Sequence, residues 1–100
     1  MNKTEAEYAE LLRSQQVAGE IIDFKFEPLR LIMAKKTSYT PDFLVVNNRG
    51  EIEIHEVKGF WRDDARVKIK TCARLFPWFR FIAVTKPRKN GGWKYEEFLP

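Results

Sequence analysis

Cysteine, histidine and long apolar segments are all scarce in this chain of 100 residues. Because Cys72 is the only cysteine, neither an internal disulfide nor a cysteine-based zinc site can form, and we expect a reducing, cytoplasmic location. No apolar run approaches the roughly 20 residues that a membrane span needs. The N-terminal residues are acidic and helical in pattern, unlike a secretory signal segment. We therefore expect no membrane association.

The residues that are present fit one small globular domain spanning residues 1–100. Hydrophobic residues make up 44% and aromatic residues 14% of the chain, which is enough to build a core. A domain of this size buries only roughly two-thirds of its unfolded surface. Extra stabilisation from a partner would therefore be unsurprising, and a homodimer stays open as an alternative to a monomer.

Positive charge is concentrated in the second half of the chain. The net charge is +4, and residues 1–50 carry seven basic and seven acidic side chains. Within residues 58–89, ten basic side chains face only two acidic ones. This segment favours a polyanionic partner such as nucleic acid, although a solvated basic surface would have the same composition.

The hydrophobic pattern predicts two helices and several strands, without repeats or linkers. The expected elements are a helix over residues 3–18 that Gly19 ends, an extended segment over 20–33 broken at Pro28, strands over 37–47 and 51–59 joined by an Asn-Asn-Arg-Gly turn, a helix within 63–77 capped by Asp63 or Asp64, a central strand over 79–85, a basic loop over 86–92, and a final strand or tail over 93–99. The order α-β-β-β-α-β, with or without one more strand, predicts a mixed sheet flanked by helices, of the α/β or α+β class. Trp78, Phe79 and Phe81 are expected in the core.

Two carboxylates are expected side by side on the central hairpin. Side chains at i and i+2 share one face of a strand, so Glu56 and Lys58 extend the apolar face of Ile52 and Ile54. Counting back from the turn places Asp42 next to Glu56 on the neighbouring strand. Such a carboxylate pair suits a hard divalent cation, and Lys58 could orient or deprotonate water or stabilise charge on a phosphate.

Pro41-Asp42 followed by Glu56-Val57-Lys58 resembles the signature of the PD-(D/E)XK nuclease superfamily. The longer string from Tyr39 to Trp61, followed by a basic helix and an apolar strand, is similar to small phage-encoded endonucleases, including Holliday-junction resolvases. The resemblance spans roughly residues 3–86 and implies a restriction-endonuclease-like core. It also implies that Asp42, Glu56 and the Val57 main-chain carbonyl bind Mg²⁺, for which Mn²⁺ can substitute.

The superfamily usually adds one more acid from its first helix. At about 100° per residue, Glu5 falls inside the apolar arc of that helix, whereas Glu7 and Glu10 fall outside it. Glu5 is therefore the expected third acid, as a direct or water-mediated metal ligand. The alternative is an ordinary first-turn acid that interacts with the helix dipole.

A set of basic and aromatic residues around this site is expected to contact DNA. In the second helix, Lys68 lies at the edge of the apolar face, and either contacts phosphate or lays its stem along the core. The full set is Trp61, Arg62, Arg66, Lys68, Lys70, Arg74, Lys86, Arg88 and Lys89. Tyr39 is assigned mainly to core packing, and His55, on the other face of its strand, mainly to structure.

The expected function is Mg²⁺-dependent hydrolysis of DNA phosphodiester bonds by Glu5, Asp42, Glu56 and Lys58 as catalytic residues. Branched DNA, such as a Holliday junction in phage DNA processing, is the substrate that the resemblance favours, with the host cytoplasm as its location. The alternatives are a nicking or general nuclease without junction specificity, and a DNA-binding module without catalysis.

Overall fold

The computed structural model of the chain describes residues 1–89 and 91–100; Asn90, within the expected basic loop, lies outside the described residues. Two helices and seven strands follow one another along these described residues. Their bounds are α1 Lys3–Val17, β1 Ile21–Phe26, β2 Leu31–Ala34, β3 Thr37–Tyr39, β4 Phe43–Asn47, β5 Ile52–Lys58, α2 Asp63–Leu75, β6 Arg80–Thr85 and β7 Lys94–Phe98.

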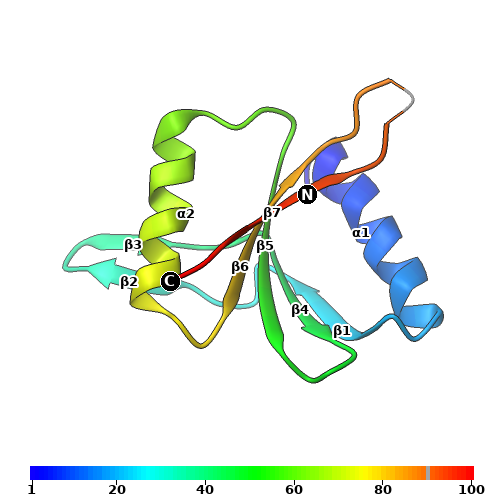
Figure 1. The fold of residues 1–100 in the computed structure, drawn as a ribbon, viewed down its shortest axis with the longest axis horizontal. Coiled ribbons are helices and arrows are strands. Elements are labelled where there is room, and N and C mark those ends of the chain that lie inside the picture. The colour runs from blue at the N-terminus through cyan, green and yellow to red at the C-terminus, as the bar shows by residue number, and fades with distance from the viewer. Residues whose placement is uncertain (90) are drawn as a thin grey trace.

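Five strands form a mixed sheet in the order β1-β4-β5-β6-β7, and β2 and β3 form a separate two-stranded sheet. Strands β5 and β6 are parallel and α2 connects them, whereas the other neighbours in the large sheet are antiparallel. The helices α1 and α2 lie on opposite faces of the sheet (Figure 1). This arrangement confirms the predicted mixed sheet flanked by helices, and β7 is the additional strand at its end. The predicted order differs in one respect, because five strands rather than three lie between α1 and α2.

Each face of the sheet has its own hydrophobic core. Tyr8 and Leu12 of α1 pack against Phe43 and Val45 of β4 on one face. On the other face, Ile69 and Cys72 of α2 pack against Ile54, Phe81 and their neighbours. Alternating side chains of β4 and β5 thus enter two different cores, which fixes the register of the central hairpin because a shift by one residue would exchange the faces.

The first helix ends as its sequence predicts. Helix α1 stops at Val17, Ala18 is its C-cap, and Gly19 follows with φ +79°. Residues without a Cβ adopt this left-handed conformation at little cost, so glycine suits the position after the helix. The extended segment over 20–33 is interrupted around Pro28, as predicted, and forms β1 and β2 on either side.

The predicted strand over residues 37–47 is wrong, because the structure divides it into β3 and β4. Residues Thr40 to Asp42 between them are not in a strand. Proline has no N–H to donate to a ladder and favours the end of a strand, so Pro41 accounts for the interruption.

Two smaller predictions are also corrected. Arg62 is the N-cap of α2 and makes no side-chain cap hydrogen bond, so neither Asp63 nor Asp64 is the cap. Both aspartates instead lie in the first turn of α2, where their charge favours the helix dipole. Trp78 is 76% exposed rather than in the core, because it lies in the turn before β6, whereas Phe81 is fully buried.

Candidate active site

The register of the central hairpin brings Asp42 and Glu56 together. Phe43 pairs with His55, so the next residues outward, Asp42 and Glu56, stand opposite each other. The Asp42 backbone N–H donates to Glu56 Oε1 over 3.2 Å. The Val57 N–H donates to Asp42 Oδ2 over 2.8 Å. The two carboxylates therefore lie side by side, as predicted, and a backbone N–H group orients each of them.

Pro41 explains why the hairpin opens at this point. Extending the register by one more pair places Pro41 opposite Val57. Proline cannot donate a ladder hydrogen bond to the Val57 carbonyl, because it has no N–H. The Val57 N–H is taken by the Asp42 carboxylate. The end of the β4–β5 ladder thus leaves a main-chain carbonyl without its usual strand donor, next to two carboxylates.

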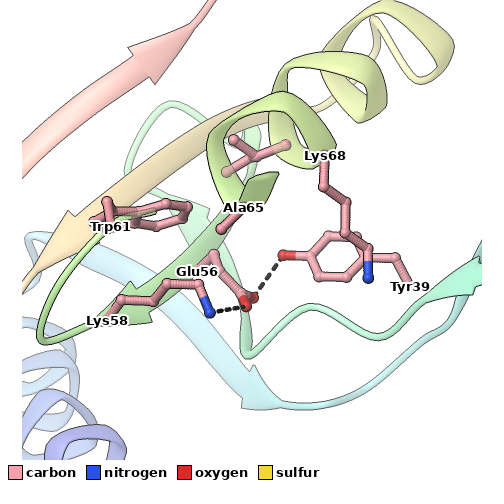
Figure 2. A pocket seen from close by; sticks show the side chains of 7 residues that line it. Tyr39, Glu56, Lys58, Trp61, Ala65 and Lys68 are labelled. Carbon is pink, nitrogen blue, oxygen red and sulfur yellow. Dashed lines mark hydrogen bonds and ion pairs between the residues drawn. The ribbon is translucent and has the colours of Figure 1, made fainter. Parts of the chain in front are cut away.

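The Glu56 carboxylate contacts side chains of β3 and of its own strand, β5. The Tyr39 hydroxyl at the end of β3 donates to Glu56 Oε1 over 2.5 Å. The Lys58 ammonium, two residues along β5, lies 3.8 Å from Glu56 Oε2. Figure 2 shows the tyrosine and the lysine approaching the carboxylate from opposite sides. The tyrosine ring is buried, as its assignment to the core predicts, but its hydroxyl also contacts Glu56, a hydrogen bond that the sequence did not indicate.

Burial and mutual repulsion disfavour the charged forms of both acids. Burial, then the nearby Glu56 carboxylate, raises the pKa of Asp42 from its ordinary 3.8 to about 7, against the opposing effect of the Val57 N–H. Burial likewise raises the pKa of Glu56, although Tyr39 and the Asp42 N–H partly offset it. Two carboxylates in this state would gain from a cation placed between them, because opposite charge favours the ionised form.

Glu5 lies in the same hollow as the pair. A cavity of about 310 Å³ is lined by residues from the start of α1 and the end of β5, among them Asn2, Glu5, Asp42, Glu56 and Lys58. The Glu5 carboxylate also contributes to the raised pKa of Asp42. The helix-angle prediction is consistent with this placement, since Glu7 and Glu10 are exposed.

The alternative interpretation of Glu5 also has a structural basis. Asn2 and Glu5 form a reciprocal capping box, in which the Asn2 N–H donates to Glu5 Oε1 over 2.8 Å. Across residues 1–89 and 91–100, no three His, Cys, Asp or Glu side chains are placed to hold a metal ion by themselves. The carboxylate site thus consists of Asp42 and Glu56. Glu5 lies nearby, and one of its carboxylate oxygens accepts the hydrogen bond that caps α1.

A second, smaller hollow adjoins the first one. It has a volume of about 90 Å³, shares Glu56 and Lys58 with the larger cavity, and is closed by Tyr39, Trp61 and α2. The Lys68 ammonium lies 5.0 Å from the centre of the Tyr39 ring, and its charge partly offsets the burial that raises the pKa of Glu56. Figure 2 shows Lys68 extending from α2 beside that ring. Lys68 therefore lies at the rim of the site, as one of the two interpretations from sequence expects.

Trp61 has a more structural environment than predicted. Its indole N–H donates to the Val84 carbonyl over 3.2 Å, and its ring is partly buried against the α2 core. The Lys58 ammonium lies 5.6 Å from the centre of the same ring. Trp61 thus supports the position of Lys58, and only part of its ring is accessible.

The predicted DNA-binding residues divide into two groups. The loop over residues 59–62, which ends with Arg62, and the loop that begins with Lys86 leave the carboxyl ends of β5 and β6, the edge at which the site lies. Lys68 lines the smaller hollow at this edge, and the two loops contain Arg62, Lys86, Arg88 and Lys89. The Lys86 ammonium lies 3.8 Å from Glu7 Oε2. The backbone N–H of Lys86 donates to the Lys58 carbonyl.

The other group points elsewhere. Arg66 forms two hydrogen bonds of 2.7 Å to Glu96 of β7 and lies over the Phe98 ring. Lys70 lines the same side of α2, and Arg74 lies in its last turn, about 18 Å along the helix from Arg62. The predicted basic stripe of α2 is therefore directed towards β7 and the far end of the helix, away from the carboxylates.

Residues 1–92 match the profile of a family described as "Protein of unknown function (DUF1064)". The chain belongs to this family. No curated protein and no solved structure matches it. The match of the DUF1064 chain covers α1, every strand from β1 to β6, and α2, so it includes all residues of the carboxylate site.

On the opposite face of the sheet, this DUF1064 protein has a buried network of hydrogen-bonded polar side chains around His55. The Tyr8 hydroxyl lies 2.6 Å from His55 Nδ1, and His55 Nε2 lies 2.8 Å from Glu53 Oε1. Glu53 also accepts a hydrogen bond from Asn47. Because Tyr8 belongs to α1, the histidine connects that helix to β5, which agrees with the structural role predicted for it.

In the described part of the chain, no helix is long and apolar enough to cross a membrane.

Proposed function

We propose that the chain is a Mg²⁺-dependent endodeoxyribonuclease of the PD-(D/E)XK type. One observation carries this proposal: Asp42 and Glu56 are held next to each other at the open end of a hairpin, with Lys58 beside Glu56. The raised pKa of both carboxyl groups supports it, because a structural pair of this kind lowers stability unless a cation offsets the repulsion.

The donor set suits Mg²⁺ better than a softer metal. Asp42, Glu56 and the Val57 carbonyl offer only oxygen atoms, and Mg²⁺ is commonly bound through one or two carboxylates, with water and substrate phosphates completing the shell. Glu5 would join through its second oxygen or through water. A cation held there would supply Lewis-acid activation of a phosphodiester and of the attacking water.

The other side chains would orient the reacting groups. Tyr39 and the Asp42 N–H fix the rotamer of Glu56, and the Val57 N–H fixes Asp42. Lys58 places a positive charge beside the carboxylate pair, where it would orient water or stabilise the charge that develops on the phosphate. Lys68, at the rim, would attract a neighbouring phosphate.

Branched DNA is the substrate class that we propose, in phage DNA processing within the host cytoplasm. Its support is the resemblance to junction-resolving endonucleases, which need two active sites and therefore a homodimer. Nicking of ordinary duplex DNA, with no preference for branches, is the competing activity. Light scattering separates the two, because the junction-resolving form requires a dimeric mass.

The test is cleavage of duplex, flap and four-way-junction DNA with Mg²⁺, Mn²⁺ or EDTA, by the wild type and by Asp42→Asn and Lys58→Ala. We expect the wild type to cut in either metal and not in EDTA. Losing a charged group that acts on the reacting phosphate should lower the rate by a factor of roughly 100 or more. Glu53→Gln is a control, because Glu53 lies three residues from Glu56 but contacts His55 on the opposite face.

Two results would contradict the proposal. The first is a wild-type protein that cuts none of these substrates while it binds them, which would favour a DNA-binding module without catalysis. The second is equal cleavage by the wild type and both site variants, which would place the chemistry elsewhere.

A further inference from the structure

A basic β-hairpin continues directly from the carboxylate site. Strands β2 and β3 form a two-stranded sheet of their own, separate from the large sheet. In Figure 1 this hairpin projects beyond α2, on the side of the molecule away from α1. Its second strand ends at Tyr39, the residue that donates to Glu56, and the chain then enters Pro41-Asp42. The hairpin is thus joined to the site by both sequence and hydrogen bonding.

The two faces of the hairpin differ in kind. Leu31 and Tyr39 are buried in the core beneath α2, and Leu29 and Met33 pack against that core. The opposite face is exposed and forms a shallow hollow of about 290 Å³, lined by Arg30, Ile32, Ala34, Lys36, Thr37 and Ser38. Within this face, Ile32 is 66% exposed. One face therefore attaches the hairpin to the domain, and the other face is exposed.

All charges on the hairpin are positive. Residues 28–41 contain Arg30, Lys35 and Lys36 and no acidic residue. All three side chains are exposed, and no residue in the ranges 1–89 and 91–100 forms an ion pair with any of them. This contrasts with the basic residues of α2 and β6, where Arg66 and Arg80 are neutralised by glutamates. The hairpin thus carries unpaired positive charge, which complements a polyanion.

We propose that this hairpin is a DNA-contacting arm that holds the duplex next to the carboxylate site. A two-stranded β-ribbon fits the major groove of B-DNA. Three residues of extended chain separate Lys36 from Tyr39, which is about 10 Å, or roughly three base pairs along the duplex axis. Lys35 and Lys36 at the tip would therefore contact phosphates a few nucleotides from the one at the site, and Ile32 would face the groove. The proposal rests on the proposed function, since it assumes that DNA is the substrate.

The test is the salt dependence of DNA binding by a charge-removed hairpin. Lys36 has φ +65°, so asparagine, which tolerates this conformation, is the suitable neutral replacement there, and glutamine is suitable at Lys35. Binding of a fluorescein-labelled duplex is measured by anisotropy in EDTA at several salt concentrations. Each phosphate contact contributes about 0.9 to the slope of log affinity against log salt. The Lys35→Gln/Lys36→Asn variant should lose about 1.8 of that slope, so a fourfold rise in salt should weaken the wild type about twelvefold more than the variant.

A matched control distinguishes contact from overall charge. Lys25→Gln/Lys94→Gln removes the same charge from exposed positions on the two edge strands, β1 and β7, and should leave the slope unchanged. Arginine at both hairpin positions should preserve the slope, because the charge is retained. Thermal unfolding of each variant monitors folding.

Each outcome decides between the proposals. An unchanged slope in the hairpin variant, with cleavage still present in the wild type, overturns the DNA arm and leaves the nuclease intact. A lowered slope with a wild type that cuts nothing supports the arm and contradicts the nuclease. If the hairpin variant instead converts a dimer to a monomer in light scattering, with the slope unchanged, the arm is overturned and the exposed face is a contact between two copies of the chain.

Discussion

Replacing Asp42 by asparagine should make the metal-free protein more stable at about pH 8. The folded state raises the pKa of this carboxyl from 3.8 to about 7, so between these two values the folded state binds more protons than the unfolded state. The free energy of unfolding therefore falls as the pH rises through this range. Asparagine is nearly isosteric and can still accept the Val57 N–H, but it carries no charge.

The expected size of this effect follows from the pKa shift. The difference between a pKa of 3.8 in the unfolded chain and about 7 in the folded protein corresponds to about 4 kcal/mol in the free energy of unfolding. This is an upper value, because Glu56 shares the repulsion. For a domain of this size, each kcal/mol changes the Tm by about 4–8 °C. Thermal unfolding in EDTA should therefore show Asp42→Asn melting above the wild type at about pH 8, and the difference should disappear at about pH 4.

The controls use a second aspartate and a metal. Asp64→Asn should lower stability by about 0.3–1 kcal/mol, since Asp64 interacts favourably with the α2 dipole. Mg²⁺ should raise the Tm of the wild type, because a ligand that binds only the folded state stabilises it, and should leave the Tm of Asp42→Asn unchanged. The reasoning is refuted if Asp42→Asn melts below the wild type at the higher pH in EDTA.

Three further predictions concern residues around the site and the core. Tyr39→Phe removes one hydrogen bond to the Glu56 carboxylate, so we expect the free energy of unfolding to change by about 1 kcal/mol and the cleavage rate to fall. An unchanged cleavage rate would show that the hydroxyl has no role in the site. Lys68→Ala should reduce the slope of log affinity for DNA against log salt by about 0.9. Arg66→Ala should leave this slope unchanged, because the Arg66 guanidinium is bound to Glu96 of β7. Equal slopes for the two variants would contradict the division of the basic residues into two groups. Phe81→Ala should lower the free energy of unfolding by about 3–5 kcal/mol in denaturant titration, because Phe81 is fully buried. Trp78→Ala should change it by less than about 0.5 kcal/mol, because Trp78 is exposed. Comparable losses in the two variants would contradict this difference in burial.

The pairing of Asp42 with Glu56 could be predicted because it depends on local rules. The Asn-Asn-Arg-Gly turn and the two-residue period of strands fix the register between β4 and β5. The period of the helix likewise separated Glu5 from Glu7, since only one side of α1 faces the sheet. Where a local repeat determines which side chains share a face, the sequence is sufficient.

Contacts between distant elements could not be predicted in the same way. The hydrogen bond from Tyr39 to Glu56 depends on the interruption at Pro41, after which strand alternation no longer relates the two residues. The ion pair between Arg66 and Glu96 depends on β7 lying at the edge of the sheet next to β6, which no local pattern specifies. Charge counting overestimated the free positive surface for the same reason, because Glu96, the acid that neutralises Arg66, lies outside residues 58–89.

The most direct measurement is the initial rate of DNA cleavage as a function of Mg²⁺ concentration, for the wild type and for Asp42→Asn. Wild-type cleavage should be absent in EDTA and rise to saturation with Mg²⁺. The variant should fold, melt above the wild type without metal, and show no Mg²⁺-dependent cleavage at any concentration. Cleavage that persists in EDTA, or that saturates equally in both proteins, would contradict a metal-dependent nuclease site at Asp42 and Glu56.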